Sequence, residues 1–143
     1  MGATRQTIFD RIGDILDTID AAIIPVKYRY PESQPSSFPA SMLLYRGASE
    51  EMVDTVYNLV TYRFSIVTVY PIAEAATAYN RWLQAYDAIA AELRKDDHQT
   101  LSGDAVKFMV EADGQPSYTD QFSQQVAVLD IRVYAEVLQS TAT

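Results

Sequence analysis

The chain has one histidine, His98, which is the first residue to consider for catalysis or metal binding. It lies in the segment DDHQT, directly after Asp96 and Asp97, so an imidazole and two carboxylates are neighbours. Such ligands suit a divalent cation, but a stable site needs more of them, and the chain has no second histidine and no cysteine. We therefore interpret residues 96–104 as an exposed loop, with a metal site as the less favoured alternative.

Other catalytic motifs are absent from the sequence. No Gly-x-Ser-x-Gly segment accompanies His98, which would have to be the general base of a hydrolase triad. The five glycines are scattered and form neither of the common phosphate-binding patterns. The absence of cysteine excludes disulfides, thiol catalysis and Cys-ligated zinc. We therefore predict a protein that is not an enzyme and that uses no metal or other cofactor.

Two acidic clusters have side chains that could bind calcium: Glu50, Glu51 and Asp54 in the first, and Asp96, Asp97 and Asp104 in the second. A calcium-binding loop needs oxygen ligands at alternating positions, a glycine at the sharp turn and a closing glutamate. Neither cluster has this pattern, so we interpret both as solvated turns.

Hydrophobic periodicity predicts two helices, at residues 5–20 and 73–95. Gly13 lies in the middle of the first and weakens it by about 1 kcal/mol relative to alanine. The second has a broad apolar stripe, whose aromatic members are Tyr79, Trp82 and Tyr86. These aromatic residues could line a small-molecule pocket, but core packing explains them more simply.

Alternation of apolar and polar residues predicts strands at 41–47, 56–71, 105–112 and 124–138. A shorter strand is possible within 22–30, at an edge or irregular, because Pro25 cannot donate a ladder hydrogen bond. Segments rich in turn-forming residues separate these elements, at 31–37, 48–54 and 113–121. The order of elements predicts one α+β domain over residues 1–143, with a mostly antiparallel sheet and two main helices packed on one face.

Each of the two longest predicted strands has one polar face. In 56–71 this face includes Arg63, and in 124–138 it includes Asp130 and Arg132. These three side chains would form either weak cross-strand ion pairs or polar contacts between subunits, and the sequence favours neither.

Composition and charge narrow the classes of partner. The chain carries 19 acidic and 11 basic residues, for a net charge of −8, so tight binding to nucleic acid is not expected. No apolar stretch approaches the roughly 18 residues that cross a bilayer, and the segment MGATRQTIFDRIGD lacks the apolar centre of a signal peptide. We therefore expect no membrane association.

The order of elements, together with several short segments, resembles the tail terminator (tail-completion) proteins of long-tailed bacteriophages. The matching segments are FPASMLLY entering a strand, a long strand ending in VYP, the helix RWLQAYDAI, and the last strand VAVLDIRVYAEV. The resemblance covers nearly the whole chain, but these are structural patterns and not catalytic signatures. The first loop of this chain is longer than in small members, so the resemblance leaves the role of this loop open.

The resemblance implies a structural protein of the virion tail, assembled in the host cytoplasm. Such proteins form a ring, commonly a hexamer, on the head-proximal end of the tail tube. The ring stops tube polymerisation and joins the tail to head-completion or neck proteins. DNA passes through the lumen without specific binding, and an acidic lining would keep it from adhering. A head-to-tail neck (connector) protein is the nearest alternative, and a small-molecule-binding α+β domain is a more distant one.

A ring component needs residues that contact neighbouring subunits. We expect the loop 31–39 to be a contact arm that includes Ser36, Ser37 and Phe38, although a connection without any partner is the alternative. The acidic turn 48–54 would be a second contact region, through Glu50, Glu51 and Asp54. The polar-face residues complete the expected interface: Arg63, Asp130 and Arg132.

Overall fold

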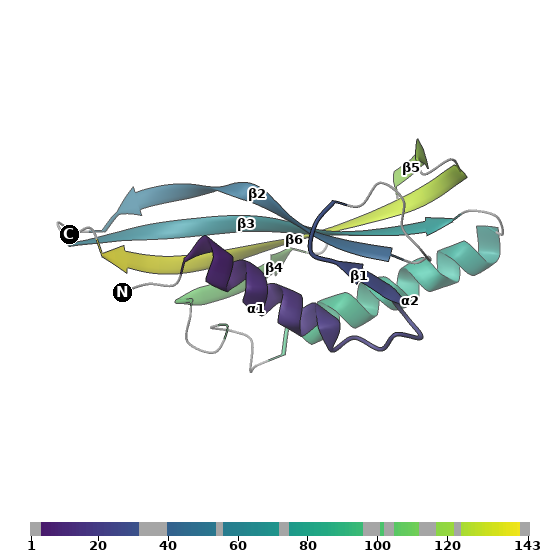
Figure 1. Ribbon diagram of the computed structural model, residues 1–143, viewed down its shortest axis with the longest axis horizontal. Helices are drawn as coiled ribbons and strands as arrows, with labels where there is room; N and C mark the ends of the chain where they lie inside the picture. Colours follow the sequence, from purple (N-terminus) through teal and green to yellow (C-terminus); the bar gives the residue numbers. More distant parts are fainter. Residues whose placement is uncertain are drawn as a thin grey trace.

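A single twisted sheet forms the centre of the computed structural model (Figure 1), which describes residues 4–31, 40–53, 56–71, 75–95, 101, 105–111, 117–121 and 124–140. The elements in chain order are α1 (Arg5–Asp17), β1 (Val26–Tyr28), β2 (Ala40–Met52), β3 (Tyr57–Pro71), α2 (Ala75–Leu93), β4 (Lys107–Glu111), β5 (Ser117–Gln121) and β6 (Gln124–Ser140). This arrangement confirms the predicted α+β fold.

Three long strands form the middle of the sheet. The strand order is β1-β2-β3-β6-β4, and β5 also pairs with β6. The strand β3 pairs antiparallel with β6 along its whole length, from Tyr57 opposite Ser140 to Pro71 opposite Val126. Among the strands that the structure describes, only β1 is parallel to its neighbour, and it is short, as expected for an edge segment that follows Pro25.

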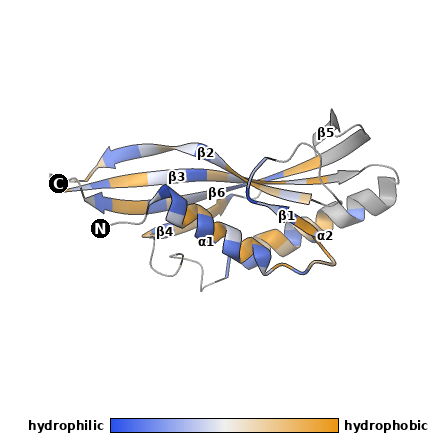
Figure 2. Ribbon diagram, in the orientation of Figure 1, coloured by the Kyte–Doolittle hydropathy of each residue, from blue (hydrophilic) through white to orange (hydrophobic). Residues whose placement is uncertain are grey.

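Both helices pack on the same face of the sheet, as the sequence predicts. The strands contribute alternate residues to this core, including Phe64 and Ile66 from β3 and Ile131 from β6. The helices contribute residues spaced three or four apart, among them Ile8 and Ile12 of α1. Figure 2 shows the corresponding alternation of apolar and polar residues along α1 and the coloured part of α2. We call the opposite face of the sheet the open face.

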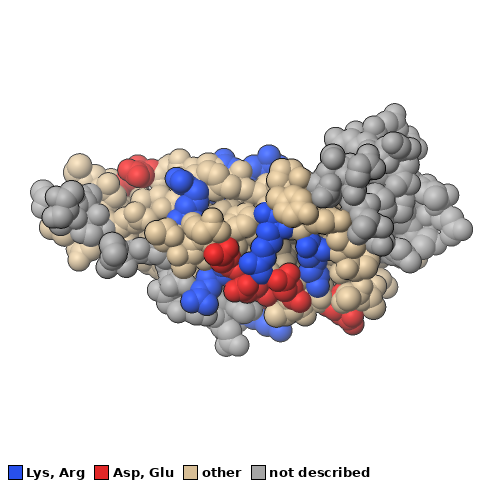
Figure 3. All heavy atoms as spheres, viewed as in Figure 1, with Lys and Arg blue, Asp and Glu red and all other residues tan. Residues whose placement is uncertain are grey.

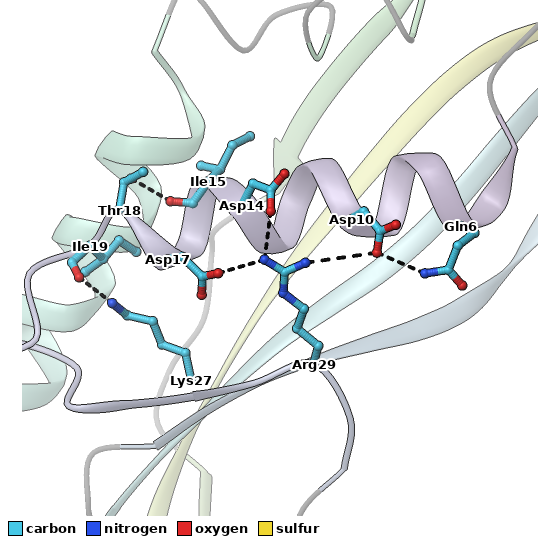
Figure 4. Close-up of polar contacts among 9 residues, drawn as sticks. All are labelled: Gln6, Asp10, Asp14, Ile15, Asp17, Thr18, Ile19, Lys27 and Arg29. Carbon is cyan, nitrogen blue, oxygen red and sulfur yellow. Dashed lines mark hydrogen bonds and ion pairs between the residues drawn. The ribbon is translucent and has the colours of Figure 1, made fainter.

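A cluster of charged side chains fastens α1 to the segment after β1 (Figures 3 and 4). The Arg29 guanidinium donates hydrogen bonds to Asp14 (2.8 Å) and Asp17 (2.7 Å), and one of its nitrogens lies 4.0 Å from Asp10. These hydrogen bonds raise the pKa of the Arg29 guanidinium above its ordinary value. The Arg29 side chain crosses Gly13, where an added Cβ would lie 2.6 Å from Nε. The glycine therefore makes room for the arginine.

The predicted turn at 48–54 is wrong, because its first residues belong to the C-terminal half of β2. The strand continues to Met52, so Glu50 and Glu51 lie on a paired strand opposite Val60 and Leu59. Gly47 does not begin a turn: with a φ of 113° it follows a β-bulge, where the register shifts between Tyr45 and Gly47. The bulge lets β2 continue past Gly47, a residue type that in a sequence often marks the end of a strand.

The predicted turn at 113–121 is also wrong in part. Residues 117–121 form β5, which pairs with the start of β6, from Ser117 opposite Val128 to Gln121 opposite Gln124. The sequence SYTDQ has no apolar alternation, so its extended conformation depends on hydrogen bonds to a neighbouring strand that the local pattern does not reveal.

Candidate functional site

A hollow lies on the open face, over the middle of β2, β3 and β6. Its volume is about 440 Å³, and we call it the arginine pocket. Its lining consists of polar side chains: Arg46, Arg63, Ser65, Asp130, Arg132 and Tyr134. Phe64 also lines it through its backbone, because the Phe64 side chain lies in the core.

Strand register brings these residues together from distant parts of the sequence. Ser65 pairs directly with Arg132, and Arg63 pairs with Tyr134, so all four side chains share one face of the sheet. Arg46 is the extra residue of the β2 bulge, and its position beside Ser65 places it in the same group. Bulges commonly redirect a side chain in this way.

Hydroxyl groups orient two of the three arginines. The Arg46 Nε donates a hydrogen bond to Ser65 Oγ at 3.0 Å, and the Arg63 Nη2 donates one to Ser49 Oγ, also at 3.0 Å. Each guanidinium has five N–H donors, so most of them remain available. Within the described part of the chain, the exposed Arg132 side chain makes no hydrogen bond or ion pair.

The neighbouring acidic groups form no ion pair with these arginines among the described residues. Asp130 makes no ion pair with a described residue, and its Oδ1 is buried without a hydrogen-bond partner there. Glu111 accepts a hydrogen bond from the Tyr134 hydroxyl at 2.7 Å instead of pairing with an arginine. This hydrogen bond, with a smaller contribution from burial, raises the pKa of Tyr134 above its ordinary value.

The arrangement is suited to binding a carboxylate or phosphate. Guanidinium groups match the two oxygens of such anions with paired hydrogen bonds, and three of them line this pocket together with Asp130, while Glu111 lies opposite Arg132 on the neighbouring strand. Among the lining residues, no nucleophile is paired with a base.

Of the residues predicted from sequence, the structure brings Arg63, Asp130 and Arg132 together. They share one pocket, as the predicted polar faces require, but the cross-strand ion pairs considered for them are not formed among the described residues. Sequence reasoning missed Arg46, although the order Tyr-Arg-Gly inside a strand pattern is a signal of a bulge.

The other predicted interface residues are separate from the pocket. Glu50 and Glu51 lie on β2 beyond it, towards the strand end, and both are exposed. Four further predicted residues lie outside the described part of the chain: Ser36, Ser37, Phe38 and Asp54. The same holds for the possible metal ligands Asp96, Asp97, His98 and Asp104. No group of three metal-ligating side chains occurs among the residues that the structure does describe.

The ends of β2, β3 and β6 form a second surface feature. These strands extend past α1 at the end where the C-terminus lies (Figure 1). The connection between β2 and β3 is closed by a hydrogen bond from Val53 N to Tyr57 O. Exposed apolar residues gather here, and we call them the strand tip: Met52 (75% exposed), Val53, Val56, Tyr57 and Leu138. Such a group is typical of an interaction surface.

A small apolar cluster flanks the arginine pocket on the side away from the strand tip. Met42 and Val69 are buried in it, and partly buried residues surround them: Tyr28, Leu44, Val67 and Val128. The open face therefore carries the charged pocket next to an apolar cluster whose central residues are already buried, and the exposed strand tip lies at the end of the sheet.

The packing of Tyr86 does not support the alternative of a small-molecule pocket between α2 and the sheet. This side chain is partly buried and packs against the main core, while the side chains of Tyr79 and Trp82 lie outside the described residues. Over the described residues, neither helix combines the length and apolar character needed to cross a membrane.

Comparison with known proteins gives no relative: no protein-family model matches the chain, and no curated protein matches its sequence.

Proposed function

We propose that this protein is a structural component of a bacteriophage tail. In this proposal it forms a ring at the head-proximal end of the tail tube, ends tube polymerisation and joins the tail to the head or neck. The observation that supports the proposal is the open face, where three arginines form no ion pair with a described residue, together with the exposed apolar strand tip at the end of the same sheet. Arginine and aromatic residues within apolar surroundings are typical of protein interfaces.

The shape of the sheet supports assembly through unlike surfaces. Only three residues of β2, Ala40 to Met42, pair with β1, so among the described residues the outer edge of β2 from Leu43 onward is unpaired. The strand tip is at one end of this sheet and the pocket is near its middle. Contacts between different patches on identical subunits generate closed rings when the rotation closes.

The remaining parts of the proposal follow from the family resemblance. The ring would be a hexamer, its partners would be the tail tube protein and a head-completion or neck protein, and its location would be the virion tail. DNA would pass through the lumen without specific binding, which suits a chain of net charge −8. No catalytic activity or cofactor is part of this function. A neck protein is the alternative with the same kind of surfaces.

The decisive experiment is electron microscopy of phage particles that lack this protein. A tail terminator predicts tails of uncontrolled length, with normal length restored when the wild-type gene is supplied. Tails of normal length that fail to join heads would instead identify a neck protein. Normal, infectious particles would refute both.

A biochemical test uses purified protein with and without isolated tail tubes. The proposal predicts a ring-sized species in size-exclusion chromatography with light scattering, either for the protein alone or after it is added to tube ends. A protein that stays monomeric in both conditions contradicts the ring.

A further inference from the structure

We propose that the arginine pocket is a binding site for a single carboxylate group. Two sources present this group in the same form: a small organic acid in solution, and an acidic side chain on the surface of a partner protein. The site goes beyond the proposed function, because all of its lining residues belong to one copy of the chain and binding needs no ring.

The register of the sheet places the three arginines around one residue, Ser65. Arg132 lies directly opposite Ser65 on β6, and the Arg46 Nε donates a hydrogen bond to the Ser65 Oγ at 3.0 Å. Arg63 lies two positions before Ser65 on β3, so the backbones of Arg63 and Arg132 are diagonal neighbours, about 7–8 Å apart. Ser65 itself is only 1% exposed. Three long cationic side chains therefore surround a buried hydroxyl.

The arginines keep most of their hydrogen-bond donors for a ligand. Arg46 and Arg63 each direct one donor to a serine hydroxyl, and Arg132 makes no hydrogen bond or ion pair within the described part of the chain. Each guanidinium has five N–H donors, and serine hydroxyls do not neutralise its charge. Like charges gathered in this way repel one another, so an anion that enters the pocket relieves that repulsion.

The two acidic residues beside the arginines do not take the place of a ligand. Asp130 forms no ion pair with a described residue, and its Oδ1 is buried without a hydrogen-bond partner there. Glu111 lies opposite Arg132 but accepts a hydrogen bond from the Tyr134 hydroxyl at 2.7 Å. The paired hydrogen bonds that a guanidinium makes to two carboxylate oxygens are therefore left for a ligand to complete.

The local charge and the size of the pocket favour a carboxylate over a phosphate. Three guanidinium groups and the carboxylates of Asp130 and Glu111 leave one positive charge on this part of the open face. A carboxylate balances that charge, whereas a phosphate group carries about −1.5 to −2 at pH 7 and exceeds it. The volume of about 440 Å³ is far larger than the roughly 30 Å³ of one water, so the group that carries the carboxylate also fits.

The test follows the arginine side chains of protein labelled with nitrogen-15 by NMR. The probes are acetate, a capped tripeptide with glutamate between two glycines, the same tripeptide with glutamine, and inorganic phosphate, all at equal ionic strength. We expect saturable shifts of the Nε–H signals of Arg46, Arg63 and Arg132 with acetate and with the glutamate peptide. We expect no saturable shift with the glutamine peptide, and weaker binding of phosphate than of either carboxylate probe.

Two variants and a matched control locate the binding. Arg63→Gln with Arg132→Gln should weaken binding of both carboxylate probes at least about tenfold, because two of the three guanidinium groups are lost. Arg94→Gln with Lys95→Gln removes the same charge in the turn after α2 and should leave binding unchanged. Arg132→Lys keeps the charge but loses the planar pair of donors, so it should also weaken binding and tests the pocket if the double substitution prevents folding. Circular dichroism verifies the fold of each variant.

The outcomes are distinct. Binding that requires both the carboxylate of the probe and the pocket arginines supports the inference. Tighter binding of the glutamate peptide than of acetate then identifies an acidic side chain of a partner, and equal or tighter binding of acetate identifies a small organic acid. Shifts that do not saturate, tighter binding of phosphate, or an equal loss of binding in the Arg94→Gln and Lys95→Gln control overturns it. Because binding needs no ring, none of these results decides the proposed function, and failure to form a ring does not decide this inference.

Discussion

Replacement of Gly13 by alanine tests whether Arg29 truly occupies the space beside α1. A glycine in a helix interior normally costs about 1 kcal/mol relative to alanine, so Gly13→Ala should stabilise an unconstrained helix by that amount. Here the added Cβ would lie 2.6 Å from Nε, 2.7 Å from Cζ and 3.0 Å from Cδ of Arg29. The arginine must therefore move.

The displacement of Arg29 offsets the gain in helix propensity. The arginine would lose its hydrogen-bonded ion pairs with Asp14 and Asp17. The Arg29 side chain is 35% exposed to solvent. Pairs in such positions contribute about 0.2–1 kcal/mol each, after screening by solvent. We therefore expect Gly13→Ala to change the free energy of unfolding by less than about 1 kcal/mol in either direction. In an Arg29→Ala background the same substitution should stabilise by about 1 kcal/mol.

The assay is a double-mutant cycle from urea unfolding followed by circular dichroism. The expected coupling between the two positions is about 1 kcal/mol. The control cycle pairs Gly13→Ala with Arg94→Ala, in the turn directly after α2, and should show no coupling. If Gly13→Ala stabilises equally with and without Arg29, the arginine does not lie against the glycine and the reasoning fails.

Three further predictions concern the sheet. Ile131→Ala, at a fully buried core position, should lower the free energy of unfolding by about 2–5 kcal/mol in urea titration, and a loss below 1 kcal/mol would contradict the packing described. Gly47→Val should destabilise by about 1–3 kcal/mol, because a φ of 113° strains a β-branched residue; an unchanged unfolding midpoint would count against the bulge. Glu111→Ala, which removes the acceptor, should lower the pKa of Tyr134 towards 10.0 in an ultraviolet titration, and an unshifted titration would disprove the hydrogen bond between the two side chains. Because the folded protein raises this pKa, the stabilisation is complete below pH 10 and is lost as the pH rises through the raised value.

Local sequence patterns predicted most of the secondary structure. The isoleucines of α1 and the alternation of β3 and β6 are periodic signals long enough to identify each element and its buried face. The same alternation placed Arg63, Asp130 and Arg132 on the polar side of the sheet. Errors occurred where a neighbouring strand decides the conformation, as in β5 and in the second half of β2.

The sequence by itself determines the net negative charge and the absence of the catalytic motifs considered above. It also determines which residues of each strand share a face, because successive side chains alternate. Only the tertiary structure decided which strands are neighbours and in what register. That register, with the bulge at Arg46, gathers three arginines over one hollow. The physical reason is that side-chain direction depends on adjacent residues, whereas the composition of a site on a sheet depends on hydrogen bonds between segments far apart in the chain.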